Sequence, residues 1–265
     1  MRIRALASGS SGNCIYAGTD ATHILIDTGI SGKKTKEGLE TLDISPDDID
    51  AILVTHEHID HVAGLGVLAR KYGIPIYATR GTIEGTMSMK QVGEIDQGLI
   101  HEIDRNEKFR IKDLDIQAIS VSHDANDPCA YRFESEGKRA AVITDLGTYD
   151  EQIVEKLKGL DALYVEANHD VRMLQVGPYP YPLKMRILGK RGHLCNEDSG
   201  KLISSLLHDG IKEIMLGHLS HENNYPDLAY ETVRLEIMNS DNKYKPDDFK
   251  IGVARRSEVS DTIIF

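Results

Sequence analysis

The sequence lacks any long hydrophobic run. Hydrophobic residues make up 40% of its 265 positions, but no stretch approaches the roughly 20 apolar residues of a membrane span. The first residues, MRIRALASGSSGN, contain no apolar segment of the kind found in a signal peptide. We therefore expect neither a membrane-spanning segment nor a secretion signal.

Cysteine is scarce. The three cysteines, Cys14, Cys129 and Cys195, are odd in number, lie far apart and form no CxxC pair. This pattern argues against a disulfide framework and favours a reducing compartment. We therefore expect a cytoplasmic protein.

An excess of positive charge is also absent. The chain has 31 basic and 42 acidic residues, a formal net charge of −11. Such a charge disfavours non-specific binding to nucleic acid, although it does not exclude a local basic groove. One segment has that character, because residues 171–193 contain no acidic side chain. Its basic residues are Arg172, Lys184, Arg186, Lys190 and Arg191.

Short β-branched runs alternate with helical patterns along the chain, which indicates a layered α/β fold. The length suits one large domain or two small ones. The segment ESEGKR predicts a hairpin turn, and Asn196 is expected to cap the helix at 196–208. Strands are expected at RIRAL, HILID, AILVT, IPIYA, LDIQAISVS, CAYRF, RAAVIT, ALYVE, EIMLG and FKIGVA, and helices near 31–42, 64–72, 149–158, 182–190, 196–208 and 226–238.

Acidic residues or histidines stand where six of these strands end. In layered α/β proteins, ligand sites collect beyond strand ends because the loops converge there. Six such positions are difficult to explain by chance, and we expect them to form one functional site. They are Asp27, His56, His123, Asp145, Glu166 and His218.

The stretch VTHEHIDHVAG, residues 54–64, is the densest group of metal-binding side chains. His56 and His58 are two residues apart, so an extended backbone directs both to the same side. Asp60 and His61 face a second position if the chain turns. Histidine and carboxylate donors without cysteine are typical of an open, catalytic metal site. A solvated histidine-rich loop or a single structural ion is the alternative.

Donors further along the chain bring the total to seven, which fits two ions better than one. A carboxylate such as Asp145 can bridge two ions. Zinc suits these donors best, and manganese and iron are also compatible. The expected ligands are His56, His58 and His123 for one ion, and Asp60, His61 and His218 for the other.

Together these motifs resemble the metallo-β-lactamase superfamily. HEHIDH fits its HxHxDH signature. LIDTG, with Asp27, precedes it, and VSHD, TDLG and GHLS follow it with His123, Asp145 and His218. The resemblance covers nearly the whole chain and implies one domain, residues 1–265, with an αββα sandwich of two mixed sheets flanked by helices. The stretches ALASGSSGN, EANHD, GHLCNED and GHLSHENN resemble the YycJ/WalJ-like bacterial subgroup, which is associated with exonuclease action on DNA from the 5′ end and with mismatch repair.

The resemblance implies metal-dependent hydrolysis through a metal-bridging hydroxide, and individual residues narrow the reaction. Asp60 supplies an oxygen ligand where lactam-cleaving relatives often have a cysteine. His58 stands where the redox relatives have glutamate. Two ions with such ligands suit phosphodiester cleavage. We therefore expect a 5′ to 3′ DNA exonuclease with Asp60 in its catalytic group.

The order LYVEANHD, GHLC, GHLS is similar to that in the tRNA-processing member of the superfamily. By that match Glu166 orients His193, which donates a proton to the leaving oxygen or stabilises the transition state. His169 is a rival for either role. The alternative for His193 is a capping or merely polar loop histidine.

Two segments are expected to contact DNA, as a single strand or at a 5′ end. In residues 171–193 tyrosines would stack on bases and basic side chains would contact phosphates, the alternative being a solvated helix face. The glycine-rich turn SGSSGN can form an anion-binding nest or be simply a tight turn. The expected contacts are Tyr179, Lys184, Arg186, Lys190 and Arg191 in the first segment, with Tyr181 as a further stacking residue, and Ser10, Ser11 and Asn13 in the second.

Three other residues near these motifs are expected to have supporting roles. Asp27 should orient the metal loop by hydrogen bonds to its backbone or histidines. Glu57 should point away from the neighbouring histidines and be structural. Cys195 is expected to be a buried, inert thiol.

Two other functions are compatible with the sequence. The acidic net charge somewhat favours a small-molecule hydrolase acting on a thioester, lactone or cyclic phosphodiester. A non-catalytic regulator that keeps the metal for stability is the other, although the full ligand set argues against it. No motif distinguishes DNA from RNA or determines the oligomeric state.

Overall fold

The computed structural model describes all 265 residues, which divide into two compact units. Met1–Ser120, Ala125–Gly137 and Arg255–Ile264 form the first unit, and Val121–Asp124, Lys138–Ala254 and Phe265 form the second. No helix is both long and apolar enough to span a membrane. The expectation of a single domain stays a prediction.

The first unit contains a mixed seven-stranded sheet of order β14-β1-β2-β3-β4-β5-β6. Strands β3 to β6 are parallel, whereas β14, β1 and β2 pair antiparallel. The carboxyl ends of β3 and β4 therefore meet at one edge of the sheet. The strands are β1 (Arg2–Ala7), β2 (Cys14–Gly18), β3 (His23–Ile26), β4 (Ala51–Leu53), β5 (Ile76–Ala78), β6 (Ile100–Glu102) and β14 (Ile263–Ile264).

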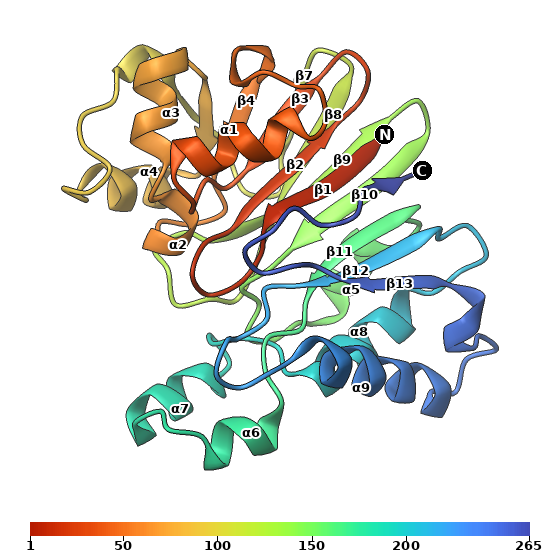
Figure 1. Cartoon of the computed structure of the whole chain (residues 1–265). Helices are drawn as coiled ribbons and strands as arrows, with labels where there is room; N and C mark the ends of the chain where they lie inside the picture. Colours follow the sequence, from red (N-terminus) through yellow and green to blue (C-terminus); the bar gives the residue numbers. More distant parts are fainter. The chain divides into compact units, whose positions relative to one another are not determined.

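Helices α1 and α3 cover one face of this sheet (Figure 1). Leu39 of α1 and Leu68 of α3 lie in one buried cluster with Tyr16, Leu25 and Ile52 of the strands. Each such side chain contributes about 1.5–3 kcal/mol by leaving water. The helices of this unit are α1 (Gly32–Glu40), α2 (Ile59–Val62), α3 (Leu65–Tyr72) and α4 (Arg80–Met87), with short 3₁₀ turns at Pro46–Asp48 and Gln97–Leu99.

Three antiparallel strands complete the first unit: β7 (Lys108–Ile111), β8 (Leu114–Ser120) and β9 (Cys129–Ser135). They contact the carboxyl end of β4. Tyr131 Oη donates to the Val54 carbonyl at 2.8 Å, and Cys129 N donates to the Thr55 carbonyl at 3.0 Å. These bonds fix the point at which the chain leaves β4.

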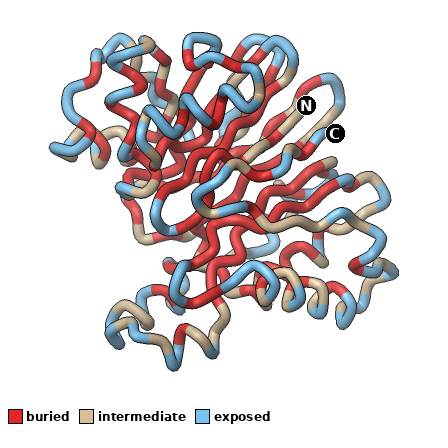
Figure 2. The backbone as a smooth tube through the Cα atoms, in the orientation of Figure 1, coloured by how far each residue is buried: buried red, intermediate tan, exposed pale blue.

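The second unit is built on four parallel strands of order β13-β12-β11-β10, within a sheet whose order continues β9-β8-β7. Strands β11 and β12 are buried along their whole length, as the red tube in Figure 2 shows. The strands are β10 (Lys138–Ile143), β11 (Ala162–Glu166), β12 (Glu213–Gly217) and β13 (Lys250–Val253).

Helices α8 and α9 pack together on one face of these strands (Figure 1). Gly200 permits the close approach, because a Cβ there would lie 3.2 Å from Val233 Cα and 2.5 Å from Glu236 Cβ. The helices of this unit are α5 (Glu151–Leu157), α6 (Val171–Val176), α7 (Tyr181–Ile187), α8 (Asn196–Leu206) and α9 (Pro226–Asn239), with a 3₁₀ turn at Pro246–Asp248.

All ten strands and all six helices expected from the sequence are present, with ends shifted by a few residues. The hairpin turn in ESEGKR is also confirmed, since Glu136 and Gly137 join β9 to β10 with φ of 50° and 78°. The capping role of Asn196 was wrong. Asn196 is the first residue of α8 after the cap Cys195, and its buried side chain bonds to Asn224 instead.

Candidate metal centre

In the first unit, Asp27 holds the loop that follows β4. It comes directly after β3 with φ of 58°, a left-handed conformation that aspartate tolerates better than most residues. Its Oδ1 accepts from Thr55 N at 2.8 Å, and its Oδ2 accepts from Thr55 Oγ1 at 2.8 Å. His61 Nδ1 donates to Oδ2 at 2.7 Å. One buried carboxylate thus fixes both ends of the histidine loop, residues 55–61.

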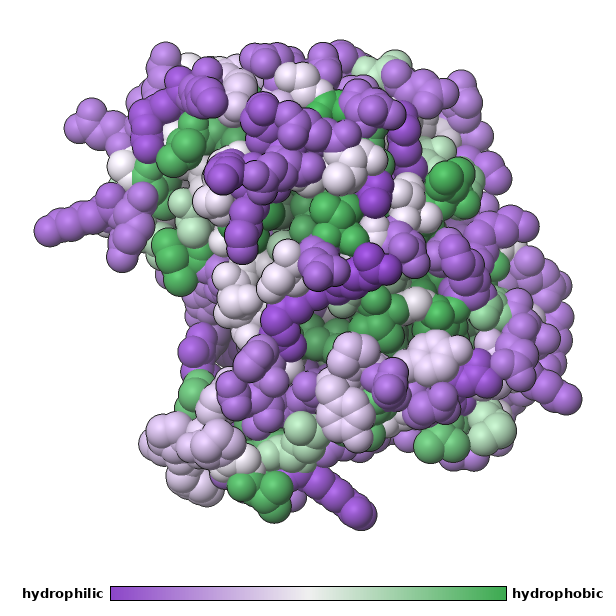
Figure 3. All heavy atoms as spheres, in the orientation of Figure 1, coloured by the Kyte–Doolittle hydropathy of each residue, from purple (hydrophilic) through white to green (hydrophobic).

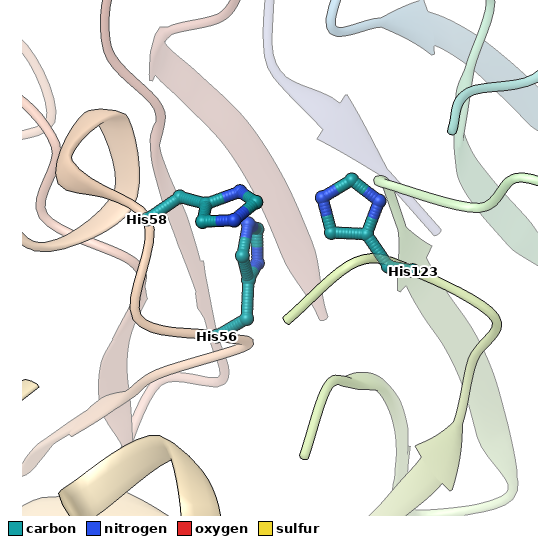
Figure 4. Close-up of side chains that lie close together, drawn as sticks. All are labelled: His56, His58 and His123. Atoms are coloured by element: carbon teal, nitrogen blue, oxygen red, sulfur yellow. The ribbon is translucent and has the colours of Figure 1, made fainter. Parts of the chain in front are cut away.

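The imidazoles of this loop lie together. The ring centroids of His56 and His58 are 4.6 Å apart, edge to face (Figure 4), and those of His56 and His61 are 4.1 Å apart. Because His61 Nδ1 donates to Asp27, its Nε2 is the acceptor in the neutral ring. That Nε2 lies 3.5 Å from Asp60 Oδ2 and 3.2 Å from Asn13 Nδ2. His61 therefore presents a lone pair beside the Asp60 carboxylate.

Glycine is required beside this loop. A Cβ at Gly29 would lie 1.6 Å from the Asp60 carbonyl oxygen, and one at Gly64 would lie 2.2 Å from the Ile30 carbonyl oxygen. Asn13 N also donates to the Asp60 carbonyl at 2.8 Å. The segment after β3 and the turn after β1 are therefore in direct contact with the backbone of the histidine loop.

Glu57 points to a different side of the loop from its histidine neighbours. Its Oε1 accepts from Asn126 N at 2.9 Å, and its side chain packs where a Cβ of Gly85 would stand, at 2.6 Å from Glu57 Cγ. The residue links the histidine loop to the segment before β9. This contact agrees with the structural role expected for it.

Replacing Asp27 with alanine should weaken metal retention about 10- to 100-fold, because three hydrogen bonds that orient Thr55 and His61 are lost. Metal remaining after titration with a chelator measures the effect. Asp20→Ala is the matched control, since its side chain is fully exposed in an ion pair with Arg2. Equal metal retention by the two variants would contradict an orienting role for Asp27.

In the second unit, Asp145 stands among three imidazoles. It follows β10 with φ of 56°, and its Oδ1 lies 3.6 Å from His123 Nε2, from His193 Nδ1 and from His218 Nε2. These distances are too long for hydrogen bonds. Two ligand atoms each about 2.1 Å from a tetrahedral ion are about 3.4 Å apart. The spacing from Asp145 to His123, and separately from Asp145 to His218, thus fits that of two ligands on one divalent ion.

Glu166, fully buried at the end of β11, connects two of these histidines. Its Oε1 accepts from His193 Nδ1 at 2.7 Å and from His218 Nδ1 at 2.9 Å. Its Oε2 accepts from the backbone N–H of Leu146 and Leu194 at 3.0 and 3.2 Å. With Nδ1 of each ring donating to Glu166, the Nε2 atoms are the ones available for other chemistry.

Contact between Glu166 and His193 shifts the pKa of both groups. Burial alone would raise the pKa of Glu166, but the charges and hydrogen bonds of His193 and His218 lower that pKa below its ordinary value. Burial would lower the pKa of His193, but the charge and hydrogen bond of Glu166 raise it above its ordinary value. The two shifts have opposite signs, and both favour the charged form of the pair over the neutral one.

His123, also drawn in Figure 4, belongs to the segment Val121–Asp124 of the second unit. Its Nδ1 donates to the Gly192 carbonyl at 3.0 Å, which leaves Nε2 toward Asp145. Burial lowers the pKa of this imidazole, against the opposing charge of Asp145. The neutral ring is the form that binds metal.

Within the second unit, Asp145, Glu166, His193 and His218 offer ligand atoms all within 4.8 Å of one another. His169 lies outside this group. It is buried, its Nδ1 lies 3.3 Å from Asn168 Oδ1, and its Nε2 has no hydrogen-bond partner. Burial lowers its pKa to about 4.

Sequence reasoning missed two contacts of His218. The first is its bond to Glu166, which was expected to orient His193 alone. The second is Asn168, whose Nδ2 donates to the His218 carbonyl at 2.9 Å. Asn168 lies within EANHD, one of the stretches that carry the family resemblance, and this was the only available signal for it.

The basic segment 171–193 forms α6, α7 and the loop that leads to His193. Arg186 pairs with Asp124, through Nε to Oδ2 and through Nη2 to Oδ1 at 3.1 Å. Arg191 Nε donates to the His123 carbonyl at 3.0 Å, and Lys184 Nζ donates to the Gln175 carbonyl at 2.7 Å. Two of the four cations expected on phosphates therefore also brace the His123–Asp124 segment, and Lys190 is exposed.

The helices of this segment carry apolar side chains on their surface. Over α6 and α7 in Figure 3, green and pale side chains gather among hydrophilic ones. Tyr181 is 74% exposed and Met185 50% exposed, while Tyr179 is partly buried. Tyr181 is therefore more open to a stacking partner than Tyr179.

The three residues of the turn SGSSGN that were predicted to contact DNA differ in their exposure to solvent. Ser10 and Ser11 are exposed, whereas Asn13 is buried. Asn13 Oδ1 accepts from Gly9 N at 3.0 Å, and its Nδ2 faces His61. Asn13 thus stabilises the turn and contacts the histidine loop.

The thiols are poor nucleophiles. Burial raises the pKa of Cys129 and Cys195 to about 12 and that of Cys14 still higher. Cys195 is only partly buried, so the expectation that its thiol is buried was only partly correct.

Since the thiolate is the reactive form, iodoacetamide at pH 8 should leave the native protein unmodified. In urea it should alkylate all three cysteines, and mass spectrometry would detect the difference. Rapid alkylation of native Cys195 would contradict this.

Comparison with known proteins agrees with the fold and the motifs. A family model described as a beta-lactamase superfamily domain matches residues 22–218. The exodeoxyribonuclease WalJ of Streptococcus pneumoniae serotype 2 is 42% identical over 236 residues, 89% of this chain and 88% of that protein. The exodeoxyribonuclease YycJ of Bacillus anthracis is 38% identical over 264 residues, 99% of this chain and 95% of that protein.

A solved structure extends the likeness to the architecture. The metallo-beta-lactamase fold protein YhfI from Bacillus subtilis superposes with a TM-score of 0.70 at 15% identity, over 98% of this chain and 99% of that one. At this identity the match concerns the fold alone. Two mixed sheets flanked by helices, as expected from the sequence, are confirmed. The chain belongs to the metallo-β-lactamase superfamily and, within it, to the family of WalJ and YycJ.

Proposed function

We propose that the chain is a metal-dependent nuclease that removes nucleotides from DNA in the 5′ to 3′ direction. The observation that carries this proposal is the 2.7 Å bond between Glu166 Oε1 and His193 Nδ1, with Asp145 Oδ1 3.6 Å from the same nitrogen. It supports the proposal, because a histidine held by a buried carboxylate lies beside the carboxylate proposed to bind metal. Phosphodiester cleavage needs such a group to protonate the leaving oxygen. The relatives named exodeoxyribonuclease support the substrate class.

In this proposal seven residues would hold two divalent ions, and Asp145 would serve both. The histidine and carboxylate donors favour zinc, with manganese and iron also accepted. When bound, the two ions supply Lewis acidity toward the phosphate and make a water molecule easier to deprotonate. The proposed sets are His56, His58 and His123 for one ion, and Asp60, His61 and His218 for the other.

The chain's own residues move the proton that the reaction requires. Breaking the P–O bond leaves negative charge on the departing ester oxygen. Glu166 orients His193 by accepting a hydrogen bond from its Nδ1. The Nε2 of His193 then donates a proton to the departing oxygen. His169 is less suited, because it makes no hydrogen bond with Glu166 and its pKa of about 4 leaves its ring uncharged at neutral pH.

The DNA strand in this proposal runs along residues 171–193 toward His193. Tyr181, at 74% exposure, offers a stacking surface, and Tyr179 a smaller one. The DNA phosphates contact Lys190 and the charged groups of Lys184, Arg186 and Arg191. The exposed Ser10 and Ser11 and the adjacent Asn13 form a further contact with the DNA. The three free cysteines support a cytoplasmic location.

End-labelled single-stranded DNA tests the proposal. With Zn²⁺- or Mn²⁺-loaded protein, a 5′ label should appear in mononucleotides from the earliest times, while 3′-labelled strands shorten gradually. Protein treated with EDTA is the control and should be inactive. Internal fragments from both labels would contradict an exonuclease. Hydrolysis of a thioester, lactone or cyclic phosphodiester with DNA left intact would favour the small-molecule hydrolase, which the net charge of −11 supports.

A further inference from the structure

Three asparagines of the second unit are almost fully buried. They are Asn168 after β11, Asn196 at the start of α8 and Asn224 before α9, with exposures of 3%, 0% and 4%. A buried amide costs stability unless its donors and acceptors are hydrogen-bonded. The partners of each amide therefore indicate what it does in the fold.

Asn168 makes two hydrogen bonds to the turn that begins at His218. Its Nδ2 donates to the His218 carbonyl at 2.9 Å, and its own carbonyl accepts from Ser220 N at 2.8 Å. His218 has φ of 56°, a left-handed conformation that residues other than glycine keep only where neighbouring contacts enforce it. The two bonds of Asn168, to residues 218 and 220, supply such contacts.

The orientation of the Asn168 amide follows from its partners. A backbone carbonyl only accepts hydrogen bonds, so the amide atom that faces the His218 carbonyl has to be the nitrogen. The amide oxygen then faces His169, whose Nδ1 donates to it at 3.3 Å. His169, which is buried and makes no hydrogen bond with Glu166, therefore supports Asn168.

The other two asparagines hold the chain around Asn168. Asn224 Nδ2 lies 2.9 Å from the Ala167 carbonyl oxygen and 3.1 Å from the Asn168 carbonyl oxygen. The amides of Asn224 and Asn196 also bond to each other, at 2.8 and 3.1 Å. The Asn196 side chain bonds to Asn224 and not to His218, so it is one contact further from the histidine.

The direction of the His218 ring depends on this turn. Its Nδ1 donates to Glu166 Oε1 at 2.9 Å, and its Nε2 lies 3.6 Å from Asp145 Oδ1. The bond to Glu166 fixes one atom of the ring, whereas the backbone of His218 fixes where the side chain begins. Both have to be held, because a ligand atom has to lie within about 0.2 Å of its preferred distance from the ion.

We propose that Asn168 is a positioning residue for His218, because its amide holds the left-handed turn that directs His218 Nε2 toward Asp145. In the two-ion arrangement proposed above, His218 is a ligand of the ion that Asp60 and His61 also hold. Asn168 therefore sets the affinity for that ion and not for the other. This inference rests on the proposed function, which supplies the ions, although its test needs no DNA cleavage.

Titration of the metal-free protein with Zn²⁺, in competition with a chromophoric chelator, tests the role of Asn168. The wild type should bind two ions. Asn168→Ala should bind one ion with unchanged affinity and the other about 10- to 100-fold more weakly, the range for loss of a contact that orients a ligand. Asn168→Leu keeps the branched shape of the side chain, so it should show the same loss without a cavity.

Asn196→Ala is the matched control, because it also removes a buried amide that makes two hydrogen bonds. Both alanine variants should melt at a lower temperature than the wild type in EDTA, but Asn196→Ala should keep the wild-type affinity for both ions. Three results would overturn the proposal: equal Zn²⁺ affinities in the two alanine variants, an equal loss for both ions in Asn168→Ala, or a single ion in the wild type.

Degradation of labelled DNA separates this proposal from the nuclease proposal. If the second ion needs Asn168 but the wild type leaves DNA intact, the positioning role stands and the nuclease proposal fails. If the wild type degrades DNA and Asn168→Ala binds both ions as tightly as the wild type, the nuclease proposal stands and the positioning role fails.

Discussion

Replacing Asp145 with asparagine should reduce DNA hydrolysis by about a thousandfold or more. The substitution keeps the side-chain shape, and asparagine tolerates the φ of 56° at this position. It removes the negative charge that lies 3.6 Å from His123, His193 and His218. A loss of about 4 kcal/mol of transition-state stabilisation corresponds to this factor. Initial rates on labelled DNA measure it.

The control for this variant is Asp209→Asn, an exposed carboxylate that pairs with Lys243. It should keep the wild-type rate. Both variants should keep the wild-type circular dichroism spectrum and melting temperature in EDTA, where metal does not contribute. If Asp145→Asn retains a tenth or more of the activity with bound metal, Asp145 does not bridge the two ions.

Replacing His193 with alanine should slow DNA cleavage about 100- to 10,000-fold, the range for removal of a general acid. The reason is its bond to Glu166, which holds the ring and raises its pKa. The substrate bis(p-nitrophenyl) phosphate distinguishes this role from a structural one. Its leaving group departs without a proton, so the variant should lose far less activity on it than on DNA.

The variant His169→Asn tests the alternative that His169 is the proton donor. His221→Ala is the control, because His221 is an exposed histidine. His169→Asn should lower both substrates' rates by the same small factor, because His169 makes no hydrogen bond with Glu166. If instead His169→Asn lost DNA cleavage selectively and His193→Ala did not, the proton donor would be His169. Equal losses of both substrates in His193→Ala would indicate a structural role for His193.

Most of the fold was predictable because its strands are buried on both faces. Runs such as ALYVE and EIMLG are continuously apolar, and the structure buries every residue of each. Strand β2, CIYAG, was missed although every residue of it is buried. Several other missed elements lack such a signal. Strand β6 is the mostly exposed IHE, and β14 has two residues that pair with β1. Helix α4, RGTIEGTM, contains two glycines and β-branched residues, which have low helix propensity.

The candidate site was only partly predictable. Motif spacing pointed to the metal ligands, because local sequence decides that His56 and His58 lie together. The bond from Glu166 to His218 spans 52 residues and depends on the parallel pairing of β11 and β12. No local pattern encodes the left-handed φ of His218, 56°, because it depends on how the chain leaves β12.

A comparison of linear and circular single-stranded DNA of the same sequence tests the central claim most directly. The metal-loaded wild type should degrade the linear strand to nucleotides and leave the circle intact, because it needs an end. Asp145→Asn should leave both intact. Nicking of the circle, or no action on either DNA, would contradict the account of this chain as a metal-dependent DNA exonuclease.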